Sequence, residues 1–417
     1  MPRHRWLPCS LLLVTALVSC TGPSAPPPSP PSVSVGGAQL SLGLPRAVHR
    51  ATTLTDGRVL ITGGCTLPGC GGFDEGRASE FFDPVVQRFL PGPLMLSARA
   101  SGTATLLLDG RVLLTGGYPG EGRDAQASAE VFDPLTESFE AVDPMISARA
   151  NHTATLLPDG RVLLAGGNGA DGDALDSTEF LDPTTGTFTA GSSLRDARAG
   201  HSAAVVGTDV VLVGGTADLV LGIESTDVLH DGTWTSGPDL LIPRVKHATV
   251  ALADGRVLVI GGSGDIEGRD RLASTEILDL AAGTATPGPD LSEPQYKLDG
   301  AVAELPDRRI VIAGGQRLDI YDQATDRITR VDEPATPRRA FVSATVLGPD
   351  LVLVAGGYTT GSPPPHKPGW CASRRSPPRH ARFRVIGGAY GSRVTVSASD
   401  NAVLDARGTY RSVWLIV

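Results

Sequence analysis

The fold is decided by residues 151–167, which read NHTATLLPDGRVLLAGG. Residues 151–157 are β-prone and residues 161–165 are apolar, and the turn Pro158-Asp159-Gly160 separates the two runs. An Asp-Gly pair between two such runs is a strong hairpin signal, because a type I′ turn needs positive φ at both central positions. We therefore expect an antiparallel hairpin that ends at the paired glycine Gly166-Gly167.

The paired glycine recurs at intervals of 42 to 53 residues, at Gly63-Gly64, Gly116-Gly117, Gly166-Gly167, Gly214-Gly215, Gly261-Gly262, Gly314-Gly315 and Gly356-Gly357. The turn signal recurs at Asp56-Gly57, Asp109-Gly110 and Asp254-Gly255. After each pair come a variable loop, a third β-prone run such as residues 177–183 and a fourth run such as the one that contains Phe188. Each repeat therefore predicts four short antiparallel strands, which is one blade of a β-propeller.

These repeats resemble the kelch family over residues 45–357. They are similar to those of bacterial kelch-containing lipoproteins and of the propeller domain of galactose oxidase. The resemblance implies an all-β, seven-bladed kelch-type β-propeller. One departure is the fourth-strand aromatic residue, which is Trp only at Trp234 and Phe in three other repeats. The same fold hosts many unrelated functions, so the resemblance indicates fold and not function.

Residues 1–20 predict an export signal. Arg3 and Arg5 precede the apolar run 11–18, which is too short for a membrane span. Residues 17–20 resemble the bacterial lipobox, whose cysteine, here Cys20, is acylated. A cleaved signal peptide without a lipid is the alternative. The Pro- and Ser-rich residues 21–37 then form a tether. We expect an exported protein, lipid-anchored to the outer or cytoplasmic membrane of a bacterial cell envelope.

Residues 38–357 are assigned to the propeller and residues 358–417 to a divergent or aberrant tail. Residues 38–46 resemble a fourth strand, so we expect the N-terminal strand to close a last blade that the repeats leave incomplete. The tail contains nine Lys and Arg against two Asp and Glu, and it lacks the Asp-Pro turn. Two interpretations stay open. The tail is a frameshifted end, or it completes the last blade with strands at residues 382–386 and 393–397.

Cys65 and Cys70 lie close together in one loop, and a disulfide is expected in an oxidising compartment. A metal pair is the alternative, but no further cysteines or clustered histidines complete a metal site. The acidic loop 168–173 lacks the spacing of a calcium loop and is expected to be a solvated turn. No metal or cofactor is predicted.

An Arg-x-x-His motif before the first strand of the repeats marks the candidate ligand-binding face. Variable loops emerge on this face, and variable loops on a rigid scaffold commonly bind ligands. In animal kelch adaptors, which these repeats resemble, arginines at this position take an acidic peptide. The candidate residues are Arg46, Arg99, Arg149, Arg198, Arg244, Arg338, His152, His201 and His247. The alternative is structural: the arginines pair between blades with a repeated acidic column that includes Glu130 and Glu179, and the histidines bond between blades.

The function expected from these features is a non-catalytic binding module at the cell envelope, for an unknown protein or carbohydrate ligand. One alternative is a sugar-modifying enzyme similar to sialic-acid mutarotases. A galactose oxidase-like enzyme is less favoured, because its copper-ligating pattern is not recognisable. The net charge of −9 gives no reason to expect nucleic-acid binding. We expect a monomer that contacts the membrane through its lipid.

Overall fold

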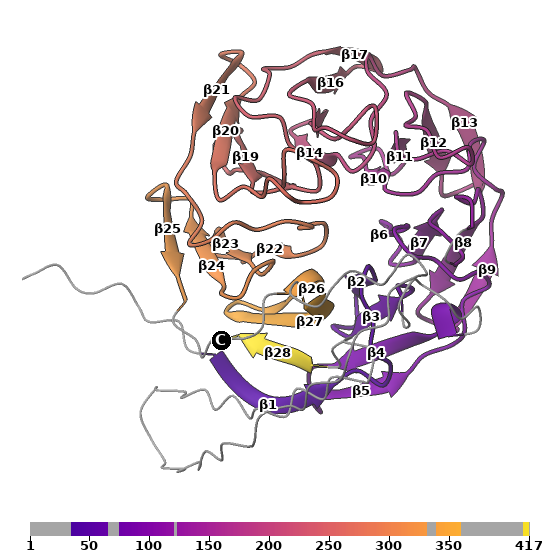
Figure 1. Ribbon diagram of the computed structural model, residues 1–417. Coiled ribbons are helices and arrows are strands. Elements are labelled where there is room, and N and C mark those ends of the chain that lie inside the picture. The colour runs from indigo at the N-terminus through magenta and orange to yellow at the C-terminus, as the bar shows by residue number, and fades with distance from the viewer. Residues whose placement is uncertain (1–34, 66–74, 121–122, 332–338, 360–411, 417) are drawn as a thin grey trace, which may run out of the picture. The chain divides into compact units, whose positions relative to one another are not determined.

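The computed structural model describes residues 35–65, 75–120, 123–331, 339–359 and 412–416. Val33–Val417 form one compact unit. Its strands form four-stranded antiparallel sheets arranged around a centre, so the predicted all-β propeller is confirmed (Figure 1). None of the described segments is a helix with the length and apolar content needed to span a bilayer.

Six blades, numbered 1 to 6 along the chain, each contain four consecutive strands. The first strands lie nearest the centre (Figure 1): β2 (Arg50–Thr53), β6 (Thr103–Leu106), β10 (Thr153–Leu156), β14 (Ser202–Val206), β18 (Ala248–Ala251) and β22 (Val302–Glu304). The second strands are β3 (Val59–Thr62), β7 (Val112–Thr115), β11 (Val162–Ala165), β15 (Asp209–Val213), β19 (Val257–Ile260) and β23 (Arg309–Ile312). The third strands are β4 (Ser79–Asp83), β8 (Ala129–Asp133), β12 (Thr178–Asp182), β16 (Thr226–His230), β20 (Thr275–Asp279) and β24 (Asp319–Asp322). The fourth strands are β5 (Arg88–Pro91), β9 (Ser138–Ala141), β13 (Thr187–Ala190), β17 (Thr233–Ser236), β21 (Thr284–Pro287) and β25 (Arg327–Arg330). A short 3-10 helix, η2 (Glu75–Arg77), precedes β4.

A composite closing sheet joins the two ends of the described chain. Its order is β1 (Val35–Ser41), β28 (Ser412–Ile416), β27 (Leu351–Thr359) and β26 (Arg339–Gly348). The outer strand β1 therefore takes the place expected for the N-terminal strand. The prediction of seven blades of one kind is wrong. The repeated unit forms six blades, because the sequence after Gly357 lacks the Glu and Asp-Pro turn of a regular third strand. The strands proposed at 382–386 and 393–397 lie outside the described residues.

The hairpin at residues 151–167 forms as predicted, but its turn type differs from the prediction. Gly160 has φ +88°, whereas Asp159 is not left-handed. The Gly160 amide donates to Leu157 O and the Leu157 amide to Arg161 O, as in a three-residue loop with one left-handed residue. Asp159 instead fixes the turn through Arg161, accepting from its amide at 3.0 Å and from its Nε at 2.8 Å.

The core fills the spaces between neighbouring sheets. The second strands β3, β7, β11 and β19 are buried at every position, because each blade packs against a neighbouring sheet on both of its faces. Between blades 3 and 4, Leu163 packs with Val210 and Leu212, and the indole of Trp234 caps the cluster and donates to Ser192 O at 3.2 Å. Each fully buried aliphatic side chain contributes about 1.5–3 kcal/mol of transfer free energy. The apolar layers hold the blades in a ring and so position their inner edges.

Candidate functional site

The repeated arginines of the described residues are buried and do not form an exposed binding face. Arg149 is 0% exposed, and its Nη1 donates to Gly166 O at 2.6 Å and to Ser177 O at 3.1 Å. Its Nη2 pairs with Glu179 Oε1 at 2.6 Å. Corresponding ion pairs join Arg46 to Glu80, Arg99 to Glu130, Arg198 to Asp227 and Arg244 to Glu276.

This arrangement corrects two expectations. The guanidinium groups of the described arginines are buried and already form ion pairs with Glu or Asp, so they are not available to an external carboxylate. The pairing is also within one blade and not between blades, because Arg149 precedes β10 and Glu179 lies on β12 of the same sheet. Burial lowers the pKa of Arg149, and the charge of Glu179 opposes this shift. Arg338 lies outside the described residues.

The backbone of the same motif joins neighbouring blades. The Gly167 amide donates to Arg198 O at 2.8 Å, and the Gly357 amide of the closing sheet donates to Arg46 O at 3.0 Å. The paired glycines permit this approach, because a Cβ on Gly166 would lie 2.4 Å from Arg198 O. The paired glycine and the Arg-x-x-His segment are therefore two halves of one inter-blade joint.

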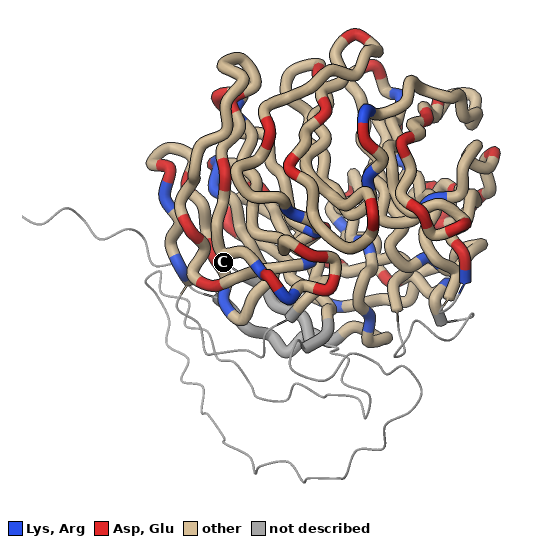
Figure 2. The backbone as a smooth tube through the Cα atoms, turned by 45° about the horizontal axis from the view of Figure 1, so that its top comes forward, with Lys and Arg blue, Asp and Glu red and all other residues tan. Residues whose placement is uncertain are grey.

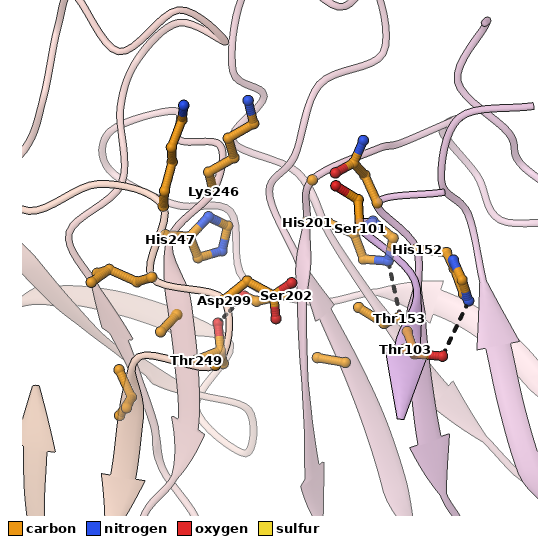
Figure 3. Close-up of a pocket in the computed structure, with 18 of the residues that line it drawn as sticks. Ser101, Thr103, His152, Thr153, His201, Ser202, Lys246, His247, Thr249 and Asp299 are labelled. Carbon is orange, nitrogen blue, oxygen red and sulfur yellow. Dashed lines mark hydrogen bonds between the residues drawn. The ribbon is translucent and has the colours of Figure 1, made fainter. Parts of the chain in front are cut away.

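The histidines of the motif are buried and neutral. His201 Nε2 lies 3.1 Å from Thr153 Oγ1, and His152 Nε2 lies 3.0 Å from Thr115 Oγ1, so each bonds to the preceding blade. His247 has no hydroxyl partner among the described residues, and burial lowers its pKa to about 3. His152, His201 and His247 nevertheless line a cavity (Figure 3). The structure therefore keeps these three predicted residues at a candidate site.

The cavity lies on the propeller axis and has a volume of about 310 Å³. It is lined by the first strands of the blades and by the segments that precede them. Hydroxyl groups contribute much of its wall, at Ser101, Thr103, Thr153, Ser202 and Thr249. Acidic and basic positions are interspersed along the described chain (Figure 2).

Two rings of residues surround the cavity. Each of the six blades and the closing sheet contributes one residue to each ring. The first, which we call the mouth ring, contains the residues that directly precede the histidine position of each repeat: Val48, Ser101, Asn151, Gly200, Lys246, Lys297 and Phe341. All seven have left-handed backbones, with φ between +51° and +64°. Their main chains are linked around the axis, since Gly200 N donates to Asn151 O at 3.0 Å and Lys246 N to Gly200 O at 2.8 Å.

The left-handed mouth ring concentrates backbone strain at one place. Left-handed φ is unfavourable for a β-branched residue such as Val48 and for a bulky one such as Phe341. Such strain persists where the surrounding structure imposes it, and it is enriched at functional sites. The ring is also the part of the motif that varies most in chemical type, whereas the arginine two positions earlier is retained in the first five repeats.

The second ring, which we call the inner ring, lies two residues further along the chain: Arg50, Thr103, Thr153, Ser202, Ala248, Asp299 and Ser343. All except Ser343 line the cavity. Arg50 of blade 1 forms an ion pair with Asp299, which precedes β22 of blade 6, at 2.6 Å. Ser343 instead bonds to His49 Nε2 at 2.9 Å.

A cationic cluster surrounds Tyr296 at the mouth ring. The Nζ atoms of Lys246 and Lys297 lie 5.6 Å and 5.3 Å from its ring centroid, and Arg271 lies 5.7 Å from it. Lys246 Nζ donates to Ile266 O at 3.2 Å and to Tyr296 Oη at 3.3 Å. Burial lowers the pKa of Lys246 to about 8. Burial and the charges of Lys246 and Arg271 lower the pKa of Lys297 to about 7.

Sequence reasoning missed both rings, because it concentrated on what the repeats share. The signal was present in the residue directly before the histidine of the motif. This residue changes from Asn151 to Gly200 to Lys246 in successive repeats. Variable positions on a rigid scaffold are disproportionately often binding positions.

The remaining candidate groups contribute no metal site among the described residues. No three His, Cys, Asp or Glu residues there are placed to hold a metal ion. In the acidic loop of blade 3, Asp171 accepts from the Asp173 amide at 3.1 Å. Cys65 is disulfide-bonded. Cys70 lies outside the described residues, so its pairing with Cys65 stays a prediction, as does the acylation of Cys20.

Two solved structures resemble this chain. The structure of YjhT gives a TM-score of 0.53 at 13% identity and covers 70% of this chain and 99% of that one. A fungal alcohol oxidase of the AA5 family, solved in complex with copper, gives a TM-score of 0.47 at 16% identity and covers 68% of this chain and 73% of that one. No protein-family model and no curated protein matches the chain. At these identities the likeness concerns the fold alone. The likeness to the YjhT structure and the six repeated blades fit a kelch-like β-propeller.

Proposed function

We propose that the chain is a non-catalytic binding module whose axial cavity takes a small anionic ligand that carries hydroxyl groups, as a sugar acid does. The volume of about 310 Å³ suits a ligand of monosaccharide size, since it lies at the lower end of the range for small-molecule sites. The hydroxyl groups of the wall match a polyhydroxylated ligand, and the cations at the mouth match a negative charge.

The observation that carries the proposal is the environment of Lys246. This amine lines the cavity, and its hydrogen-bond partners are a carbonyl and a phenol, so no carboxylate of the described residues neutralises it. An ammonium group held in a partly buried site without an opposite charge is a favourable receptor for an anion. The nearby Arg271 and Lys297 strengthen the local positive potential.

The second candidate, a sugar-modifying enzyme, needs a general acid or base beside the ligand. A general base works best when its pKa lies near the operating pH. Burial lowers the pKa of His247 to about 3 and that of His152 well below its usual value, so these imidazoles are weak bases. Neither imidazole is therefore suited to general-base catalysis, which favours the binding role.

The location proposed for this module is the bacterial cell envelope, with a lipid on Cys20 as anchor. This part of the proposal rests on the N-terminal sequence, which combines the apolar run, the lipobox and the Pro- and Ser-rich tether. A tethered propeller with one open axial cavity would present that cavity to ligands outside the cytoplasm.

The test is a panel of neutral and acidic monosaccharides and short acidic peptides, titrated by calorimetry against the chain without its signal. We expect saturable binding of at least one sugar acid and at least tenfold weaker binding by Lys246→Met. The control is Arg308→Met. Arg308 is an exposed cation in the β22–β23 turn, at the other end of the first strand from the cavity mouth.

Three results would count against the proposal. Binding that Lys246→Met leaves unchanged would place the ligand elsewhere. Binding of peptides alone would favour a protein-interaction module. Conversion of a sugar during the titration, detected by NMR of the ligand, would favour the enzyme.

A further inference from the structure

The inner ring departs from its own repeat at two positions. Five of its seven residues are small and neutral: Thr103, Thr153, Ser202, Ala248 and Ser343. The two charged members are Arg50 and Asp299, and they form an ion pair with each other at 2.6 Å. A scaffold that needs only small side chains at this position has no structural use for either charge, so the pair calls for another explanation.

The guanidinium of Arg50 bonds to the backbone on one side and to a side-chain carboxylate on the other. Its Nε donates to Gly102 O of blade 2 at 2.6 Å, and its Nη2 bonds to Asp299 Oδ2. Nη1 makes no hydrogen bond with the described residues. The Arg50 side chain is 18% exposed, whereas that of Asp299 is 62% exposed. The carboxylate is therefore the more hydrated partner of the two.

We propose that Arg50 is the carboxylate receptor of the axial cavity and that the Asp299 carboxylate takes the place of the ligand's carboxylate on Arg50 when no ligand is bound. This inference rests on the proposed binding function and assigns the anionic group of the ligand to one residue. A ligand carboxylate would displace Asp299 into solvent and bond to Nη1 and Nη2. Two parallel N–H···O bonds to one carboxylate are the preferred geometry of the arginine fork.

Displacing the Asp299 carboxylate from Arg50 should cost little free energy. An ion pair with one well-exposed partner contributes little to stability. Removing Asp299 should therefore improve the affinity for an acidic ligand by about two- to fivefold. Since the backbone bond to Gly102 does not depend on Asp299, Arg50 keeps its position in the variant.

The experiment compares D-glucuronate with D-glucose, which share a ring and differ in the carboxylate. Calorimetric affinities are measured for the wild-type chain, Asp299→Asn, Arg50→Met and the matched control Asp307→Asn. Asp307 belongs to the same blade, is partly exposed and pairs with Arg309 in the β22–β23 turn. The control therefore removes one negative charge at the other end of the strand. Thermal melting of each variant verifies the fold.

We expect Asp299→Asn to bind glucuronate about two- to fivefold more tightly and Asp307→Asn to bind it as wild type does. Arg50→Met should lose the preference for glucuronate over glucose. Equal glucuronate affinity in wild type and Asp299→Asn overturns the displacement, while leaving the proposed function intact. Retained acid preference in Arg50→Met overturns the assignment of the receptor. Absence of saturable glucuronate binding to every variant overturns this inference, whereas the proposed function fails only when no sugar acid of the panel binds.

Discussion

Replacing Glu179 by Gln should destabilise the propeller far more than replacing an exposed carboxylate. Glu179 Oε1 accepts from Arg149 Nη2 at 2.6 Å and from the Ser147 amide at 2.9 Å, and Oε2 accepts from the Ile146 amide at 2.7 Å. Glutamine has one acceptor oxygen, so its NH₂ group would face a donor and the buried Arg149 would lose its counter-charge. Removing one partner of a buried pair costs about 3–5 kcal/mol.

Urea unfolding followed by circular dichroism measures this cost. With a slope of about 3 kcal/mol per molar urea for a chain of this size, the midpoint should fall by about 1 M or more. The control is Asp159→Asn, because Asp159 and Arg161 form a pair with side chains about half exposed. An exposed pair contributes up to about 1 kcal/mol. A Glu179→Gln midpoint within error of that of Asp159→Asn would refute the structural role given to the arginine column.

Two further predictions rest on the structure and a third rests on the N-terminal sequence. Affinity for a sugar acid should fall as the pH rises from 6 to 9, because Lys297 and Lys246, with pKa values of about 7 and 8, lose their positive charges in that range. Calorimetry at both pH values checks this, and a pH-independent affinity would show that the two lysines do not attract the ligand. Gly166→Ala should destabilise the fold more than Gly172→Ala. Both glycines have positive φ, but only a Cβ at residue 166 would meet a backbone oxygen, at 2.4 Å. Urea unfolding measures the difference, and equal midpoints would contradict the close approach of neighbouring blades. Cys20→Ser should abolish incorporation of a fatty-acid label in bacteria, and a labelled variant would show that Cys20 is not the lipid site.

The repeat architecture could be predicted because each blade repeats the same local signals. The Asp-Gly turn, the apolar second strand and the paired glycine each depend on residues close together in sequence, such as Asp159, Gly160 and Gly166. The predicted turn type was wrong, because the loop has three residues and only Gly160 among them is left-handed; Asp159 accepts hydrogen bonds from the Arg161 amide and Nε. The composite closing sheet could be predicted only in part, because its strands come from opposite ends of the chain.

The candidate site was predicted less well, for a physical reason. Arg149 and Glu179 were both recognised, but sequence does not reveal that both are buried and satisfied by each other. The residues that line the cavity were hidden among variable positions. Arg50 and Asp299 are 249 positions apart and become partners only when the ring closes. Charged residues that are brought together only by the closure of the ring leave no local pattern in the sequence.

The central claim is that ligands bind in the axial cavity, and a crystal structure of the chain with the tightest-binding sugar acid of the panel tests it most directly. The account predicts ligand density on the propeller axis, with the carboxylate beside Arg50 and the hydroxyl groups beside Thr153 and Ser202. Ligand density on the outer loops, with the axial cavity holding only water, would contradict it.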